Sequence, residues 1–417
     1  MNLVRKSLLR YDGGIWIRVI GAALTTITGF MIRPFLVLYL YDRLESVLLP
    51  MLVVALQPLC GLFVSWFGGG MSDRLGRKPV MIAALLLQAA SMAGYVFADA
   101  IWQFAAVSVL NGIGQALFMP ASNAQMTDMV PAERRAEVYA LLHTAFNVGA
   151  AIGPMLGLAL FRWNPQIVFF IAAGATCAYT LLVAFKMEET APAVIARKSS
   201  GEKGLPSLRG GRQGGLKLLF RKERTLLAIT LLSLPVSLLY TLAETAMPIH
   251  LQAHFDHSQA VFAGMLTFNG LAVIALQIWI ARKTERMSSY KLIGCSYALF
   301  SIVAIGYGYS TAIVALYAAE FIFTIGEMIY GPHIQKEISL MAEEERRGFY
   351  FAVFGASRLL AAGIGPIAAG LAMEWANGET LFTVVAVLIV ACGIGAFRLL
   401  RKQQAAKRTE QYGAAAE

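Results

Sequence analysis

Residues 69–79 of the chain read GGMSDRLGRKP and stand between two long apolar stretches. Gly69 and Gly76 permit a tight turn, because glycine adopts backbone conformations that other residues avoid. Asp73, Arg74 and Arg77 can make charge-assisted contacts with one another or with the end of a helix. This stretch therefore predicts a short polar loop that joins two helices long enough to cross a bilayer.

The composition around this loop is that of a membrane protein. Of the 417 residues, 58% are hydrophobic and 14% are charged, against about 25% charged in an ordinary soluble domain. Mean hydropathy is +0.62. Because a spanning helix needs about 20 apolar residues, we predict an all-α membrane protein with twelve spans. They lie at about 15–41, 46–70, 80–98, 101–127, 135–162, 166–186, 225–252, 259–281, 291–308, 311–338, 347–374 and 379–399.

Lysine and arginine set the expected orientation, because they are concentrated in cytoplasmic loops. The opposite side of the predicted bundle carries only Arg43 and Arg162 near the span ends. Both termini are therefore expected in the cytoplasm of a bacterial-type cell, with the chain in its inner membrane. The net charge of +10 is interpreted as topology and attraction to anionic lipid rather than as binding of nucleic acid. The basic residues on the cytoplasmic side lie in 5–10, 74–78, 134–135, 282–286, 346–347 and 401–408.

An internal repeat divides the chain into halves. Ile113-Gly114-Gln115 recurs as Ile325-Gly326-Glu327, and Ile152-Gly153-Pro154 recurs as Ile364-Gly365-Pro366, both at an offset of 212 residues. A polar stretch rich in Gly, Ser, Arg and Lys separates the halves. Repeated bundles that rock about a central site are typical of transporters, although such a repeat could also be retained for packing alone. We expect an N-terminal bundle at 1–187, a cytoplasmic linker at 188–223, a C-terminal bundle at 224–400 and a cytoplasmic tail at 401–417.

The string from Gly69 to Pro79, with twelve spans and duplicated halves around it, resembles the hallmark loop of the major facilitator superfamily. The resemblance covers essentially the whole chain. It implies two pseudo-symmetric six-helix bundles and a gating loop in which Asp73 latches onto the neighbouring half, supported by Arg74 and Arg77. The second-half counterpart keeps Glu285 and Arg286 but lacks the glycine and the later bases.

A second pattern is similar to the motif of the drug–proton antiporter branch of that superfamily. It places Gly149, Gly153 and Gly157 at four-residue spacing beside Pro154. Small residues at this spacing permit close helix approach in lipid, so generic packing is the alternative interpretation. The branch often carries an arginine in the fourth span, where this chain has Ser108. Proton coupling would then have to be arranged differently.

Five charged side chains fall inside predicted spans, where each needs a partner or a water-filled cavity. Arg33 could bind an anionic group or snorkel toward the interface. Glu320 and Glu327 are seven residues apart and so share one helix face. Arg358 is predicted to pair with Glu320, either for coupling or as a structural ion pair. Glu327 is the predicted proton carrier, and Glu244 is the alternative carboxylate.

These observations favour a secondary active exporter of small amphipathic or cationic compounds, driven by protons. The alternatives are an uptake permease or lipid carrier of the same fold, or a membrane sensor or enzyme. Nothing in the chain resembles a nucleotide-binding loop, and no output domain or polar catalytic cluster is visible. We expect the partners to be a small-molecule substrate, protons and membrane lipids. We expect a monomer with no cofactor, no metal and no enzymatic activity.

Overall fold

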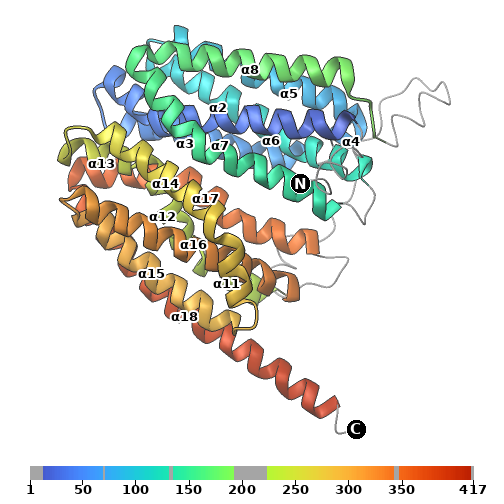
Figure 1. Ribbon diagram of the computed structural model, residues 1–417, viewed down its shortest axis with the longest axis vertical. Helices are drawn as coiled ribbons and strands as arrows, with labels where there is room; N and C mark the ends of the chain where they lie inside the picture. The colour runs from blue at the N-terminus through green and yellow to red at the C-terminus, as the bar shows by residue number, and fades with distance from the viewer. Residues whose placement is uncertain (1–12, 69–70, 131–134, 192–222, 342–346, 415–417) are drawn as a thin grey trace, which may run out of the picture. The chain divides into compact units, whose positions relative to one another are not determined.

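The computed structural model describes residues 13–68, 71–130, 135–191, 223–341 and 347–414. Within these ranges every regular element is a helix (Figure 1), so the predicted all-α class is confirmed. The Cα positions form two compact units, Met1–Gly211 and Arg212–Glu417, called the first and second units below. Their boundary falls inside the segment 188–223 that the sequence indicates as a linker.

In the described part of the first unit, one short helix lies among six long ones. The short helix, α4, lies within the loop predicted at residues 69–79. Helix α2 packs along α7, α3 along α6, and α5 against α6 and α8. The helices are α2 (Gly13–Leu44), α3 (Leu48–Gly68), α4 (Met71–Leu75), α5 (Arg77–Phe97), α6 (Ile101–Met129), α7 (Arg135–Trp163) and α8 (Pro165–Lys186).

The second unit repeats this plan, except that its first predicted span is divided into three pieces. Its helices α15 and α18 run side by side along most of their membrane-spanning length (Figure 1). The helices are α11 (Arg224–Leu232), α12 (Leu234–Thr245), α13 (Met247–His254), α14 (Ser258–Thr284), α15 (Ser289–Tyr309), α16 (Ile313–Met341), α17 (Arg347–Trp375) and α18 (Gly378–Ala414).

Eleven helical stretches of the described chain are long and apolar enough to cross a membrane. The remaining predicted span, at 46–70, corresponds to α3. Its helix is 21 residues long, and the apolar part with described side chains is Leu48–Val64. All twelve predicted apolar runs are therefore helical over most of their length.

The predicted continuous span at 225–252 is wrong in detail, because the chain is interrupted between α11 and α12 and again between α12 and α13. Each interruption is followed by a proline, Pro235 or Pro248, at the start of the next helix. Proline has no backbone N–H, so the carbonyl four residues earlier loses its helical partner. The second break leaves Glu244 at the end of α12, beside a helix end rather than within an unbroken helix.

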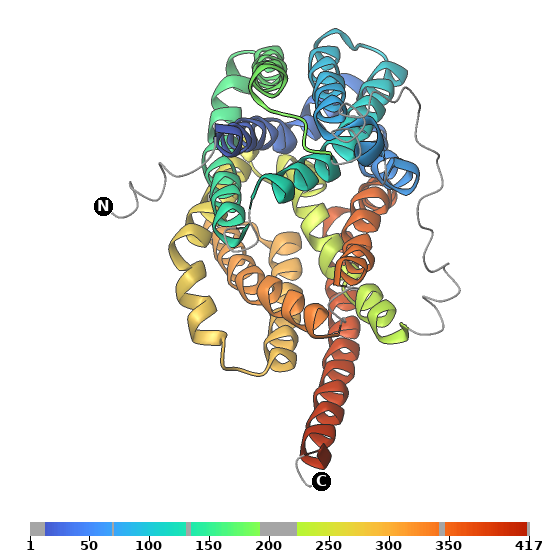
Figure 2. The same ribbon diagram turned by 90° about the vertical axis from the view of Figure 1, so that its right-hand side faces the viewer.

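Helix α18 continues past the last predicted span and through the segment predicted as a tail, to Ala414. Figure 2 shows this helix extending well past the other helices of its unit. Residues 401–412 contain Ala, Gln, Lys, Arg and Glu and neither Gly nor Pro. These are good helix formers, so the helix continues although its apolar stretch has ended.

The glycines of the antiporter-like motif fix the packing of α7 on α2. A Cβ atom on Gly149 would lie 2.9 Å from the backbone N of Ile27, and one on Gly153 would lie 2.9 Å from the Ile27 carbonyl oxygen. Gly157 meets the backbone of Met31 in the same way. Because real Cβ contacts are longer than this, only glycine allows the two helices to approach so closely. This contact accounts for the glycine spacing by packing.

Candidate functional site

The polar interior of the second unit centres on α16. Glu320 is buried at 4% exposure, and its Oε2 accepts a hydrogen bond of 2.6 Å from the hydroxyl of Tyr307 on α15. One helical turn further on, Thr324 donates from Oγ1 to the carbonyl oxygen of Glu320 over 2.7 Å. Glu327 lies on the same helix face and is half-buried. The structure thus places two carboxyls in one stripe, as their spacing predicts.

A single amide on α14 ties this stripe together. Nδ2 of Asn269 donates to Oγ1 of Thr324 at 3.0 Å and to Oε2 of Glu327 at 3.1 Å. An uncharged donor that reaches a carboxylate fixes its rotamer and satisfies one of its oxygens. Sequence reasoning missed both Asn269 and Tyr307. A usable signal was available, since each is a polar side chain within an otherwise apolar span.

Two other predicted residues act on the same carboxyl. The charged groups of Arg358 on α17 and Glu244 on α12 both lie within electrostatic range of the Glu327 carboxyl. Arg358 also lies within electrostatic range of the Tyr240 hydroxyl. Both side chains are exposed rather than packed in the core of the unit. The structure therefore brings Glu244, Glu320, Glu327 and Arg358 into one electrostatic cluster.

The predicted ion pair between Glu320 and Arg358 is not formed. Among the described residues, the ion pairs within 4.0 Å do not include these two side chains. The Oε2 atom of Glu320 instead accepts its hydrogen bond from Tyr307 on the buried side.

Arg33 belongs to the first unit and is separate from this cluster. Its side chain is exposed, and its guanidinium carbon lies 5.9 Å from the centre of the Phe30 ring. A cation over an aromatic face is a favourable contact. Phe30 in turn packs edge-on against Phe146 at 5.4 Å.

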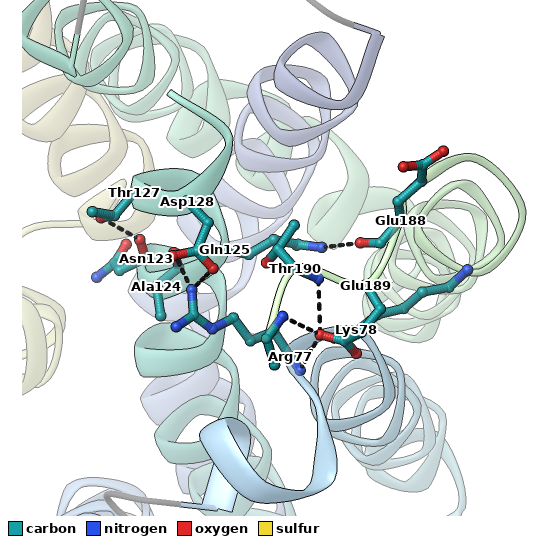
Figure 3. A network of polar contacts seen from close by, with 11 residues as sticks. Arg77, Lys78, Asn123, Ala124, Gln125, Thr127, Asp128, Glu188, Glu189 and Thr190 are labelled. Atoms are coloured by element: carbon teal, nitrogen blue, oxygen red, sulfur yellow. Dashed lines mark hydrogen bonds and ion pairs between the residues drawn. The ribbon is translucent and has the colours of Figure 1, made fainter. Parts of the chain in front are cut away.

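The loop between α3 and α5 forms a second polar site, on the first unit. Gly69 and Gly70 lie outside the described residues, and of Asp73 only the backbone, in α4, is described. Arg74 is half-buried at the end of α4. Arg77 donates from Nη1 to the carbonyl oxygen of Ala124 at 2.7 Å and forms an ion pair with Asp128 on α6. Figure 3 shows these contacts converging on the start of α5.

Glu189, which the sequence assigns to the linker, completes this site. Its carboxylate accepts hydrogen bonds from the backbone N–H groups of Arg77 at 2.9 Å and Lys78 at 3.2 Å, and also from Thr190 and Ala191. The first two donors are the unpaired N–H groups of the first turn of α5, so the carboxylate caps this helix and meets the positive end of its dipole. Gly76 has φ of +104°, and a Cβ there would collide with this carboxylate.

Comparisons with known proteins agree with this architecture. The sequence profile of the Major Facilitator Superfamily matches residues 19–335 and 229–416. The Uncharacterized MFS-type transporter YhjO of Bacillus subtilis (strain 168) is 34% identical over 92% of both chains. A Na(+), Li(+), K(+)/H(+) antiporter of Planococcus maritimus is 25% identical over 92% of this chain and 95% of its own.

More distant similarities extend this picture. Multidrug resistance protein MdtH of Cronobacter sakazakii is 25% identical over 95% of both chains. A crystal structure of a POT family transporter in complex with 5-aminolevulinic acid superposes with a TM-score of 0.73. It is 12% identical and covers 93% of this chain and 96% of its own, so it shows the fold alone. With the profile matched over nearly its full length, this chain belongs to the Major Facilitator Superfamily of membrane transporters.

Proposed function

We propose that this chain exports small amphipathic or cationic compounds from a bacterial cell in exchange for protons. It works as a monomer in the cytoplasmic membrane, with both termini in the cytoplasm. The observation that carries the proposal is the stripe of Glu320 and Glu327 on α16, held by Tyr307 and Asn269. Ionisable groups inside a membrane protein are expensive and mark the pathways of ions and protons.

Glu327 is the group that exchanges a proton for substrate. Asn269 bonds only its Oε2, and among the described residues no hydrogen bond is made to Oε1. That oxygen is free to take a proton or to face the positive end of a substrate. Because one negative charge cannot satisfy both at once, binding of substrate and proton is competitive, which makes the exchange obligatory. Glu320, bonded to Tyr307, supports the carrier.

Alternating access supplies the transport cycle. The internal repeat and the family membership support rocking of the two bundles about a site between them. The loop at 69–79, with Asp73 as the latch, stabilises one of the two states. Cross-linking the cytoplasmic ends of the bundles through introduced cysteines should stop transport, and a cross-linked protein that still transports would exclude rocking.

Exchange of an inorganic cation for a proton is the second candidate function. The relative from Planococcus maritimus bears the name of a Na(+), Li(+), K(+)/H(+) antiporter, and MdtH bears that of a multidrug resistance protein. Carboxylate, amide and hydroxyl oxygens around Glu327 are ligands that hard cations accept. The same carboxyl would then bind Na⁺ or K⁺ in place of an organic cation.

Everted membrane vesicles test the proposal. We expect ATP-energised vesicles to accumulate ethidium or tetraphenylphosphonium, and an uncoupler to collapse the accumulation. Vesicles that take up neither compound but release protons when Na⁺ or K⁺ is added would favour the second candidate. Accumulation that persists with the uncoupler, or proton-driven movement in the opposite direction, would contradict proton-coupled export.

A further inference from the structure

His254, at the end of α13, is held between two oxygen acceptors. Its Nδ1 lies 2.8 Å from the carbonyl oxygen of His250, and its Nε2 lies 3.1 Å from Oε1 of Glu379, in the first turn of α18. The side chains of His254 and Glu379 are 34% and 27% exposed. The pair is therefore accessible at one end of the second unit, between elements that are far apart in the sequence.

This geometry requires a proton between the two side chains. A carbonyl oxygen can only accept, so Nδ1 must carry the hydrogen of the first bond. A neutral imidazole then has a lone pair on Nε2, which would face a carboxylate oxygen that is also an acceptor. The contact becomes a hydrogen bond only when a proton sits on Nε2 or on Glu379. His254 and Glu379 are thus arranged to bind one proton from the medium.

His250 is the next titratable group inward. Its side chain is 4% exposed, and its ring centre is 4.5 Å from that of His254. The His250 ring is therefore enclosed by the unit, and of the two histidines the outer one, His254, is the group that the medium reaches.

The interior side of this group lies near the acidic stripe. The rings of His250 and Tyr307 both pack against Phe382, at 5.6 and 6.0 Å between ring centres, and the hydroxyl of Tyr307 donates to Glu320. Gly378 leaves room for the ring, because a Cβ there would collide with Nδ1 of His250. Asp256 and His257 follow α13 and are exposed. The order from the surface inward is His254 with Glu379, then His250, Tyr307 and Glu320.

We propose that His254 and Glu379 form the extracytoplasmic proton-binding site of this transporter. The inference rests on the proposed proton-coupled export and on the predicted orientation, which places the connection from α13 to α14 outside the cytoplasm. The step moves only a proton. The lone pair of Nε2 or the Glu379 carboxylate takes it from hydronium, which becomes water, and the pair returns the proton when the transporter changes state.

The competing interpretation is a structural ion pair that fastens α13 to α18, and His254→Arg separates the two. Arginine keeps the charge and the ion pair but does not release its proton in the accessible pH range. The measurement is uptake of ethidium or tetraphenylphosphonium into everted vesicles whose lumen, the extracytoplasmic side, is buffered between pH 5.5 and 8. Cation-for-cation exchange, which needs no proton, is measured in the same vesicles.

We expect wild-type uptake to rise as the lumen becomes more acidic. His254→Arg, His254→Gln and Glu379→Gln should flatten this dependence and reduce uptake about 100-fold, the lower part of the range for loss of a proton-transfer group, while exchange stays normal. His257→Gln, which removes an exposed histidine at the same end, is the control and should match the wild type. A wild-type pH profile in His254→Arg and Glu379→Gln would overturn the proton site and leave proton-coupled export standing. If uptake by the wild type does not depend on lumen pH, both the proton site and proton-coupled export are overturned.

Discussion

Tyr95 of the first unit and Tyr307 of the second stand at equivalent positions of the repeat, 212 residues apart, yet their hydroxyls have different partners. Tyr95 accepts a hydrogen bond of 3.4 Å from the amide of Gln57. Tyr307 donates one of 2.6 Å to the carboxyl of Glu320. The repeat equivalent of Glu320 is Ser108. One backbone plan therefore carries neutral groups in one unit and an ionisable group in the other.

The same difference recurs along the helix. In the first unit, Gln115 donates to Asn111 at 2.8 Å, and Asn111 donates to Ser91 at 2.7 Å. Such a closed chain of neutral groups can fasten helices but cannot gain or lose a proton near pH 7. Glu327 replaces Gln115 in the second unit. This contrast supports the proposal that the titratable site lies in the second unit.

Helix packing at these positions differs as well. Gly112 lies against the backbone of Gln57, and its repeat equivalent is Thr324, which is bonded to Asn269. The first unit thus fastens α6 to α3 by direct backbone contact. The second unit uses a side-chain hydrogen bond between α14 and α16, and the donor of this bond also reaches Glu327. In the second unit, the amide that joins the two helices also bonds the Glu327 carboxyl. In the first unit, the contact of Gly112 with the Gln57 backbone involves no carboxyl.

The largest effect on stability is expected from filling the contact at Gly112. A Cβ there would lie 2.9 Å from Cα and 3.1 Å from C of Gln57, so Gly112→Ala should destabilise the protein by about 1–3 kcal/mol through overpacking. Gly174→Ala is the control, because no atom lies within 4 Å of its added Cβ. Thermal unfolding in detergent measures both variants. Equal midpoints for the two variants would show that the close contact is not tight.

The next effect, no larger than that of Gly112→Ala, is expected from the two tyrosines. Tyr307→Phe leaves a buried carboxyl without its donor and should cost about 1–3 kcal/mol, whereas Tyr95→Phe should cost about 0.5–1.5 kcal/mol. Combining Tyr307→Phe with Glu320→Gln in a double-mutant cycle isolates the pair, because the coupling energy measures their direct interaction. A larger loss of stability for Tyr95→Phe than for Tyr307→Phe would show that the first unit has the stronger buried hydrogen bond.

The smallest effect concerns the first turns of the equivalent helices α5 and α15. Glu189 caps α5 in the first unit, whereas the equivalent helix α15 begins at Ser289 without a side-chain cap. Glu189→Ala should therefore lower stability by about 1 kcal/mol. Glu188→Ala is the matched control, since its side chain is exposed and only its backbone carbonyl is bonded, by Gln125. Identical unfolding midpoints for the two variants would refute the cap.

The sequence predicts the architecture well because membrane spans are long runs of apolar residues and the halves repeat without gaps. It does not predict where a span breaks. Pro235 and Pro248 each follow a break, at the start of a new helix, while other prolines, such as Pro120, lie inside one. Nor does it identify the partners of charged groups. Glu320 meets Tyr307 rather than Arg358 because side-chain direction depends on helix rotation, which apolar periodicity inside a membrane barely constrains.

Glu189 illustrates the same limit at the surface. Its neighbours in sequence are polar and mark the start of a linker, and nothing local indicates that its carboxylate caps a helix that begins 112 residues earlier. Asn269 was equally hidden, although its repeat equivalent is Gln57, an amide that also bonds across helices. Comparing polar residues at repeat positions, rather than charged ones alone, would have found this pair.

The most direct test of the central claim is proton movement itself, measured with a pH-sensitive dye sealed inside proteoliposomes while substrate is added. Glu327→Gln gives the second unit the amide that the first unit has at Gln115, and Gln115→Ala is the matched change in the first unit. We predict that the wild type and Gln115→Ala move protons in response to substrate, and that Glu327→Gln loses this movement at least about 100-fold while still exchanging substrate. Normal proton movement by Glu327→Gln, or its loss in Gln115→Ala, would contradict the assignment of the titratable site to the second unit.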